Sequence, residues 1–304
     1  MSIKADSLID RLYLKKQVNK WKALAILFAI VTALVAARNV IVPDSNKKGG
    51  DYIARLTISG FVGDDQRVYD LISDIKNDRK AKAVIVWLDT PGGSAVGGEE
   101  IYTRLRELAK IKPVVSVMRS VSASAGYMIA LGGDYILARP GTITGSIGVV
   151  IETAEITGLI EKLGINPITI KSSPLKASPS PFEKANPAAE KVLKDMIMDF
   201  YNHFVDITTE RRKLPRKKVV SLADGRVYSG TQAVENKLID AIGGEKEAVE
   251  WLAKNRNVNP KLTISDVEIE EEHPLIDRII NGVVGDFWQK SRVKLDGLLA
   301  LWHP

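Results

Sequence analysis

The sequence has 304 residues, of which 45% are apolar and 26% charged, the balance of an ordinary globular protein. This composition excludes collagen-like, coiled-coil and wholly disordered chains. The absence of cysteine excludes disulfide scaffolds, iron–sulfur clusters and cysteine nucleophiles. The three histidines, His203, His273 and His303, form no close pair, so we expect no metal site built from several histidines.

The positive charge gathers at the start of the chain. The first 22 residues contribute +4 of the net charge of +6, so the rest of the chain has no strongly basic face for nucleic acid. An apolar run over residues 23–37 follows, and it reaches the length of a membrane span when it is extended to residues 21–42. A cleaved signal peptide and a buried core helix are the alternatives.

We interpret this region as an uncleaved signal anchor. Residues 1–20 then form a basic cytoplasmic tail, 21–42 a transmembrane helix and 43–52 a polar linker. Because positive charge stays on the cytoplasmic side, residues 43–304 are expected across the membrane.

From Tyr52 onward, short apolar runs of strand length alternate with amphipathic helical patterns. Such alternation predicts βαβ units and an α/β fold, although periodicity does not tell an open sheet from a spiral. The predicted strands are residues 53–58, 83–88, 114–118, 135–137, 147–151 and 168–170. The predicted helices are residues 68–76, 97–108, 125–131, 156–163, 188–212 and 245–253.

Three turns rich in glycine and serine lie among these strands: DTPGG (89–93), SVSASAGY (120–127) and TGSIG (144–148). The paired glycines of the first turn allow a sharp bend that aims backbone N–H groups at an anion or oxyanion. A serine before a helix is usually a cap, but as a nucleophile it would lie near N–H groups that stabilise an oxyanion. No P-loop or GxGxxG pattern is present.

A serine nucleophile needs a base, and the sequence leaves two kinds open. His203 would serve a Ser-His-Asp arrangement from within the long predicted helix. Lys171 or Lys176, in a segment rich in serine and proline, would serve if loss of solvent keeps the amine neutral. The S-x-x-K pattern occurs several times and does not select between them.

In this order, the segments resemble the signal peptide peptidase A (SppA) family of serine peptidases, whose catalytic domain is related to ClpP and the crotonases. The resemblance covers about residues 53–255. It implies a ClpP/crotonase-like spiral of βαβ units. Its motifs are the DTPGG turn, ASAGY (123–127), TGSIGV (144–149), the lysine loop KSSPLKASPSPF (171–182) and DGRVYSGTQA (224–233).

The resemblance also implies roles for single residues. Ser124 becomes the nucleophile, Lys176 the general base and Ser146 the hydroxyl that orients the lysine. The oxyanion donors fall on the N–H groups of Gly92 or Gly93 and of Ala125. Ala125 stands where the family usually has glycine, and we expect its methyl to narrow the cleft.

The family further implies hydrophobic peptide substrates, such as signal peptides already released, and no metal or cofactor. It implies a homo-oligomeric ring, usually an octamer in the short form, with active sites built from more than one subunit. The expected location is the bacterial inner membrane, with the catalytic domain on the periplasmic side. A crotonase-like acyl-CoA enzyme and a non-catalytic membrane scaffold are the other classes considered.

The remaining expectations concern the walls of the cleft and the end of the chain. Val121 and Met128 are expected to form apolar walls that suit small or aliphatic substrate side chains. We expect a peptidase domain over 53–265 and an amphipathic extension over 266–304. That extension would pack on the body, contact another subunit or lie on a membrane surface.

Overall fold

The computed structural model describes residues 50–267 and 299–301, together with residues 18, 20–22 and 26. The chain divides into two units, Met1–Gly50 and Asp51–Pro304. Within the described part of the chain, no helix has the length and apolar character needed to cross a membrane. Most of the predicted anchor and of the predicted C-terminal extension lies outside the described residues.

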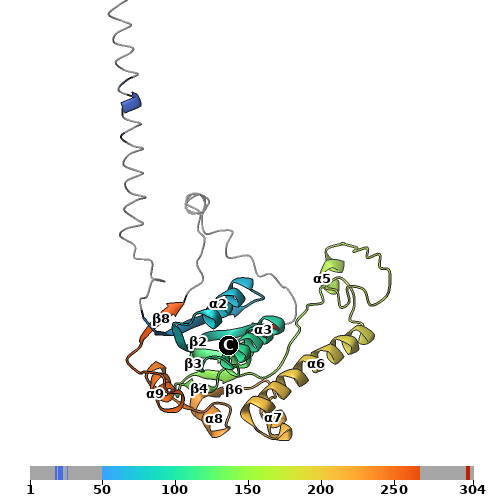
Figure 1. Ribbon diagram of the computed structural model, residues 1–304. Coiled ribbons are helices and arrows are strands. Elements are labelled where there is room, and N and C mark those ends of the chain that lie inside the picture. Colours follow the sequence, from blue (N-terminus) through green and yellow to red (C-terminus); the bar gives the residue numbers. More distant parts are fainter. Residues whose placement is uncertain (1–17, 19, 23–25, 27–49, 268–298, 302–304) are drawn as a thin grey trace, which may run out of the picture. The chain divides into compact units, whose positions relative to one another are not determined.

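The second unit is a mixed α/β fold around one largely parallel sheet (Figure 1). Along its main path the strands follow the order β6-β5-β3-β2-β1-β8; β4 pairs with β3 and β7, and β9 pairs with β2. The strands are β1 (Tyr52–Val62), β2 (Ala81–Ser94), β3 (Val114–Ala123), β4 (Tyr135–Ala138), β5 (Ile143–Gly145), β6 (Val227–Ser229), β7 (Ala241–Ile242), β8 (Thr263–Val267) and β9 (Leu299–Leu301). Each of β2, β3 and β4 pairs in parallel with the strand before it, which confirms the predicted βαβ units.

Helices cover both faces of the sheet. They are α2 (Gln66–Asn77), α3 (Ala95–Ala109), α4 (Ala125–Ala130), α5 (Thr157–Lys162), α6 (Pro187–Arg212), α7 (Arg216–Leu222), α8 (Gly230–Glu235) and α9 (Glu245–Arg256). Val84 and Val86 of β2 join a core with α2, α3, α4 and α6, whereas Ala83 and Ile85 join a second core under α9. Because strand side chains alternate between faces, burial on both sides explains the unbroken apolar run at 83–88.

Two predicted strands are wrong. Instead of a strand at 147–151, the structure has β5 at Ile143–Gly145, because Gly145 and Ser146 adopt positive φ angles and end the strand. The predicted strand at 168–170 is irregular, and Ile168 and Ile170 are 88% and 94% exposed. Their alternating β-branched pattern favours a strand, but within the described residues no other strand pairs with them.

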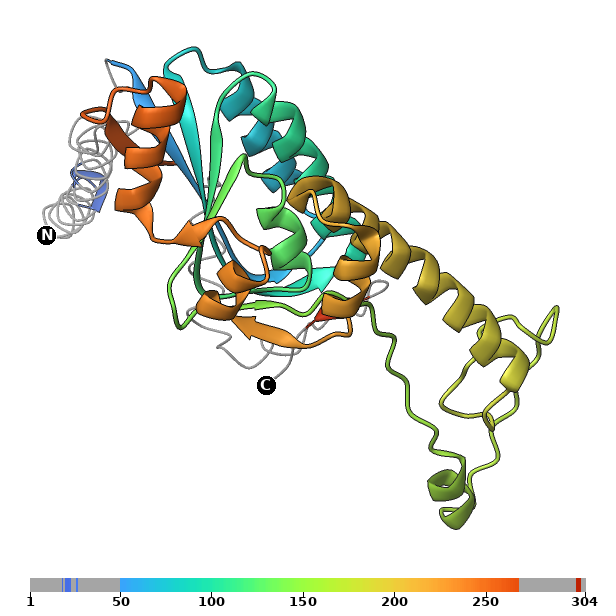
Figure 2. The same ribbon diagram turned by 90° about the horizontal axis from the view of Figure 1, so that it is seen from below.

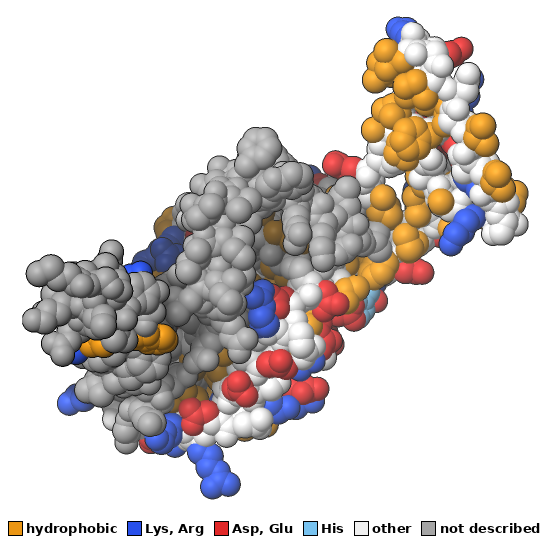
Figure 3. All heavy atoms as spheres, turned by 90° about the horizontal axis from the view of Figure 1, so that it is seen from above, with side chains coloured by type: hydrophobic (Ala, Val, Ile, Leu, Met, Phe, Trp, Pro, Cys, Tyr) orange, Lys and Arg blue, Asp and Glu red, His pale blue; other side chains and the backbone are white. Residues whose placement is uncertain are grey.

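The segment between β5 and α6, residues 146–186, is named here the arm. Beyond its first residues it runs away from the sheet and returns along the start of α6 (Figure 2). Hydrophobic side chains gather on its surface (Figure 3). The large exposed ones are Val150, Leu159, Leu163, Ile165, Ile168, Ile170, Leu175 and Phe182.

Candidate active site

Ser124 stands at the junction of β3 and α4. Its φ of 56° and ψ of −120° lie in a region that L residues rarely occupy and that sharp turns use to present a side chain. Its N–H donates to the carbonyl oxygen of Gly145 over 2.8 Å. The residue is 1% exposed, and among the described residues its Oγ has no hydrogen-bond partner. The backbone therefore fixes this hydroxyl while leaving it available to a base.

The other two serines of the turn are accounted for differently. The Oγ of Ser122 donates to the carbonyl oxygen of Gly126 over 3.1 Å inside the protein. Ser120 is exposed. The hydroxyl of Ser124 does not cap α4, so the ordinary interpretation of a serine before a helix fails at this position.

Helix α4 is fixed tightly behind the nucleophile turn. Tyr127 is fully buried and its hydroxyl donates to the carbonyl oxygen of Leu238 over 2.8 Å, while burial raises the pKa of this phenol. A Cβ on Gly126 would lie 2.7 Å from the methyl of Thr90. This close approach joins α4 to the end of β2, and it explains the glycine of the ASAGY motif.

The DTPGG turn at the end of β2 is held by its own polar side chains. The Thr90 hydroxyl donates to the carbonyl oxygen of Gly60 over 2.5 Å and accepts the N–H of Gly92 over 3.0 Å. The Asp89 carboxylate accepts the N–H of Val121 over 3.1 Å, which joins the turn to β3. Because the N–H of Gly92 already has a partner, Gly93 is the better candidate for an oxyanion donor.

Glycine is required at both positions of this turn. Gly92 has a φ of 119°. A Cβ on Gly93 would lie 1.9 Å from the carbonyl oxygen of Val62. The roles of Asp89 and Thr90 were not foreseen from the sequence, although a hydroxyl residue beside Pro-Gly-Gly is a signal for a turn of this kind.

Ala125 does not narrow the cleft, so that expectation is wrong. The residue is fully buried, and a Cβ on Gly98 of α3 would lie 2.9 Å from the Ala125 Cβ. The methyl is therefore packed against the backbone of α3. The N–H at position 125, which the proposed chemistry uses, is unaffected by this choice of side chain.

Ser146 lies beside the nucleophile turn because β3 and β5 are paired, with Ala123 opposite Gly145. It has a φ of 49° and its N–H donates to the carbonyl oxygen of Arg226 over 2.9 Å. That acceptor belongs to the DGRVYSGTQA motif, which continues into β6 and pairs antiparallel with β5. The motif thus fixes the backbone of Ser146, whose hydroxyl has no hydrogen bond within the described part of the chain.

The two lysines of the arm differ in their partners. Lys171 forms an ion pair with Glu183 and donates to the hydroxyl of Ser178 over 3.2 Å. Lys176 is exposed, and its amine has neither an ion pair nor a hydrogen bond among the described residues. No hydrogen bond joins Lys176 to Ser124, so the isolated chain does not assemble the predicted pair.

His203 of α6 points to a different partner. Its Nε2 lies 3.1 Å from Oε1 of Glu99 on α3, and both side chains are nearly half exposed. No hydrogen bond links it to Ser124. This contact is a surface pair between two helices and gives no support to a Ser-His-Asp arrangement.

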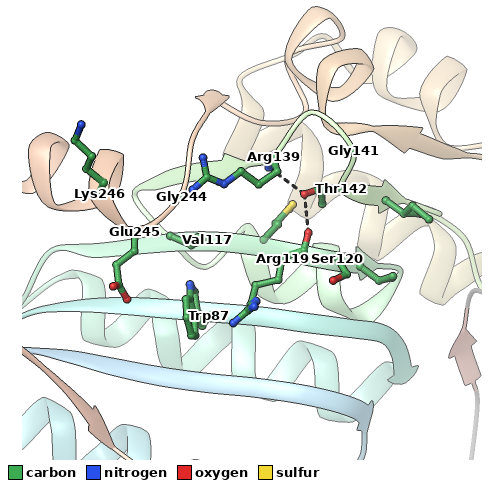
Figure 4. A pocket seen from close by; sticks show the side chains of 13 residues that line it. Trp87, Val117, Arg119, Ser120, Arg139, Gly141, Thr142, Gly244, Glu245 and Lys246 are labelled. Atoms are coloured by element: carbon green, nitrogen blue, oxygen red, sulfur yellow. Dashed lines mark hydrogen bonds between the residues drawn. The ribbon is translucent and has the colours of Figure 1, made fainter.

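A cavity of about 640 Å³ opens beside β2 and β3, near the start of α9 (Figure 4). Arg119 and Val121 line it, and the guanidinium of Arg119 stacks on the ring of Trp87 with 4.2 Å to the ring centroid. Neither Ser124 nor Ser146 lines this cavity. Val121 lines this cavity, whereas Met128 is 4% exposed in the core and does not line it.

Among the described residues, no group of three or more metal-ligating side chains comes together. The polar groups that do meet are hydroxyls and backbone N–H groups at adjacent strand ends. These groups suit nucleophilic attack on a carbonyl carbon followed by stabilisation of an oxyanion.

Comparison with known proteins identifies the family of the chain. The model of peptidase family S49 matches residues 106–259. A predicted protease of Synechocystis is 36% identical over 76% of this chain and 83% of its own length. A predicted signal peptide peptidase SppA of Enterococcus faecium is 35% identical over 72% of this chain and 67% of its own. The chloroplastic serine protease SPPA of Arabidopsis thaliana is 31% identical over 72% of this chain but only 32% of its own.

Among solved structures, a mutant ClpP1 from Listeria monocytogenes superposes with a TM-score of 0.43 at 12% identity, covering 64% of this chain and 92% of that one. The S49 match spans half of this chain, and the Synechocystis relative matches about three quarters of this chain and 83% of its own length. The chain therefore belongs to peptidase family S49 and is a serine-type peptidase of the SppA group in its single-domain form.

Proposed function

We propose that the protein is a membrane-anchored serine endopeptidase with a Ser124–Lys176 dyad, which degrades hydrophobic peptides such as released signal peptides. One observation carries this proposal: the buried Ser124 hydroxyl has no hydrogen-bond partner among the described residues and sits at a strained strand-to-helix turn. A buried hydroxyl without a hydrogen-bond partner lowers the stability of the folded protein. Such a group is therefore rare, and a catalytic role is one explanation for it.

The reaction follows from these groups. Neutral Lys176 accepts the proton of Ser124 as Oγ attacks the peptide carbonyl carbon. The N–H groups of Gly93 and Ala125 bind the resulting oxyanion. Lys176 then donates its proton to the leaving amine, and the acyl group stays on Ser124 as an ester. Water next attacks this ester while Lys176 accepts its proton, and Lys176 returns that proton to the Ser124 oxygen as the acid product leaves. Ser146 orients the lysine by a hydrogen bond.

We further propose that Lys176 reaches Ser124 from a neighbouring copy in a homo-oligomeric ring. The arm that carries Lys176 exposes many large apolar side chains, which soluble monomers rarely leave in contact with water over a large area. A second copy would cover them. Lys171 is already paired with Glu183, so Lys176 is the lysine available for transfer of a proton.

The location and the finer fold complete the proposal. Residues 21–42 serve as a single-pass anchor that leaves the catalytic domain on the outer side of the bacterial inner membrane. The first four strands, each beside the one before, support a ClpP/crotonase-like spiral. The amphipathic extension then lies near the membrane or a neighbouring subunit.

Hydrolysis of a fluorogenic apolar peptide by the full chain in detergent tests the chemistry. Ser124→Ala and Lys176→Ala are both expected to lose activity by at least about a thousandfold. Lys176→Arg is expected to be equally inactive, because a guanidinium stays protonated. Full activity in Lys176→Ala, with assembly unchanged, would exclude Lys176 as the base.

Mixing the two inactive variants tests the origin of the lysine. If the lysine comes from a neighbour, co-assembled Ser124→Ala and Lys176→Ala chains form some complete sites and recover part of the activity. A double variant, Ser124→Ala with Lys176→Ala on one chain, is the control, since mixed with Lys176→Ala it offers no lysine. No recovery in the first mixture would place both groups on one chain.

A further inference from the structure

The cavity of about 640 Å³ beside β2, β3 and the start of α9 carries an excess of positive charge (Figure 4). Three of the side chains that line it are cations: Arg119, Arg139 and Lys246. Among the described lining residues Glu245 is the single acidic one, and its carboxylate accepts a hydrogen bond from Arg55 over 2.8 Å. Because Arg55 of β1 already balances this carboxylate, the cavity is suited to an anionic ligand.

Arg119 of β3 is the cation best placed to bind such a ligand. Its guanidinium stacks on the ring of Trp87, with 4.2 Å to the centroid, and this stacking orients the group (Figure 4). Arg55 stacks on the same ring at 4.4 Å from β1, the neighbour of β2 on its other side. Within the described part of the chain, no ion pair or hydrogen bond engages the guanidinium of Arg119. Its N–H groups therefore remain available for the two oxygens of a carboxylate.

Arg139 approaches the cavity along the start of α9. A Cβ on Gly244 would lie 2.5 Å from Nη2 of Arg139, so glycine at this position leaves room for the guanidinium. The Glu247 carboxylate is 3.9 Å from Arg139, whose side chain is 63% exposed, so this ion pair holds it only weakly. The N-terminus of α9, at Glu245, adds a partial positive charge to that of the side chains.

The inner part of the cavity is apolar. It is lined by the ring of Trp87 and by the aliphatic or thioether side chains of Val117, Met118, Val121 and Ile143. Val117 and Met118 are buried in β3, so they lie at the bottom of the cavity. A ligand that fills the whole cavity therefore combines an apolar body with an anionic group.

The cavity lies on the face of the sheet that α9 covers. Val117 packs with Ala248 and Leu252 of α9 in one core, whereas Ala125 and Tyr127 of α4 belong to the core on the other face. A ligand in the cavity would therefore be separated by the sheet from the helix that follows the nucleophile.

We propose that this cavity binds the C-terminal end of an apolar peptide, with the carboxylate on Arg119 and an apolar side chain against Val117 and Trp87. Its volume lies within the range of roughly 300–1,000 Å³ that is usual for sites of small ligands. Peptides of this class are the products of an endopeptidase that cuts apolar chains. The identification of the ligand as a product thus rests on the proposed function, whereas the affinity for an apolar carboxylate does not.

Isothermal titration calorimetry on the full Ser124→Ala chain in detergent tests the site, since this variant leaves the probe intact. The probe is N-acetyl-Leu-Leu with a free carboxylate, and saturable binding is expected. The matched probe is its C-terminal amide, which keeps the apolar body but has no charge and is expected to bind at least about tenfold more weakly. Inorganic phosphate has the charge without the apolar body, and we expect it to compete only at concentrations at least about tenfold higher.

Two substitutions in the Ser124→Ala chain assign the binding to this cavity. Arg119→Gln is expected to weaken binding of the acid at least about tenfold and to leave binding of the amide unchanged. Lys254→Gln is the control, because Lys254 is an exposed cation of the same helix α9 that does not line the cavity. Trp87→Phe keeps an aromatic ring under Arg119, and it should abolish the change in tryptophan emission that the acid produces while calorimetry still detects binding.

Equal affinities for the acid and the amide would overturn the inference, and so would undiminished binding of the acid to Arg119→Gln. Phosphate that competes as strongly as the acid would contradict the apolar part of the site and overturn it equally. Binding of the acid at Arg119 by a chain whose original form hydrolyses no peptide would contradict the peptidase proposal alone. Hydrolysis by the original chain without binding of the acid at Arg119 would contradict this inference alone.

Discussion

The methyl group of Ala125 packs directly against Gly98, where an added Cβ would lie 2.9 Å from the Ala125 Cβ. The contact joins the residue after the nucleophile to helix α3. It leaves room for one methyl group between the two backbones, and Ala125 supplies it. The departure from the family's usual glycine is thus matched by a glycine on the opposing helix.

Gly98→Ala is therefore expected to disturb both stability and catalysis. Two methyl groups in this space overpack the core, which costs about 1–3 kcal/mol of unfolding free energy. Adding Ala125→Gly restores the original volume, since the new Cβ then meets the Cα of residue 125 at 3.3 Å. Chemical denaturation and kcat of the two single variants and the double variant measure the coupling. Additive effects in the double variant would contradict the contact.

Thr90 is expected to govern the geometry of the oxyanion turn. Thr90→Val keeps the shape but leaves the Gly60 carbonyl and the Gly92 N–H without their partner, at a cost of about 1–3 kcal/mol. We expect kcat to fall about tenfold, the equivalent of ~1.4 kcal/mol. Thr90→Ser keeps the hydroxyl and should retain most activity. Equal losses in both variants would point to packing of the methyl group instead.

His203→Ala is expected to leave peptide hydrolysis nearly unchanged. The imidazole contacts Glu99 on the surface, and such exposed pairs contribute about 0–1 kcal/mol to stability. Measured kcat and KM within twofold of the original would agree with a lysine base. A loss as large as that of Ser124→Ala would instead revive the Ser-His-Asp alternative.

The Tyr52–Asp78 hydrogen bond, 2.6 Å long, predicts a pH dependence of stability. It lowers the pKa of the Asp78 carboxyl, while burial and this bond raise the pKa of Tyr52 to about 12. A carboxyl whose pKa is lower in the folded state stabilises the fold above its unfolded pKa, and this contribution is lost as the pH falls through the folded value. Tyr52→Phe should therefore destabilise the protein on the order of 1 kcal/mol at pH 7 and less at pH 3.

Urea denaturation of the original protein and of Tyr52→Phe, at pH 7 and at pH 3, measures how the loss of unfolding free energy depends on pH. Asp78→Asn is the control, because it removes the charge at every pH. A Tyr52→Phe effect that stays constant between pH 7 and pH 3 would contradict the link to the Asp78 carboxylate.

The alternation of buried strands and amphipathic helices was sufficient to predict the sheet of parallel strands. Burial on both faces leaves a clear signature in the run at 83–88, and helix α6 has a long regular pattern. The failure at 168–170 has a physical cause: local propensity favours a strand, but pairing depends on a neighbour that the sequence does not specify. Ile168 and Ile170 have a high strand propensity, but both side chains are exposed because no strand among the described residues pairs with this segment.

For the site, the sequence pattern predicted three candidate turns, and the resemblance to the SppA family selected Ser124, Ser146 and Gly92 or Gly93 within them. The parallel pairing of β2, β3 and β5 brings these turns side by side. The contributions of Asp89 and Thr90 depend on hydrogen bonds to distant backbone groups, which no local pattern reveals. Position 176 is different in kind. Its amine has no ion pair or hydrogen bond within the residues described, so no such contact of these residues fixes its position.

The positive φ angle of Ser124 lowers the folding stability of the protein at the residue that we propose as the nucleophile. A side chain at φ 56° and ψ −120° costs about 1–3 kcal/mol relative to glycine, which adopts this conformation freely. Ser124→Gly should therefore unfold at a higher temperature than the original protein and than Ser124→Ala, while both variants are inactive. The protein would be more stable without its nucleophile, so this position shows a trade-off between folding stability and catalytic activity.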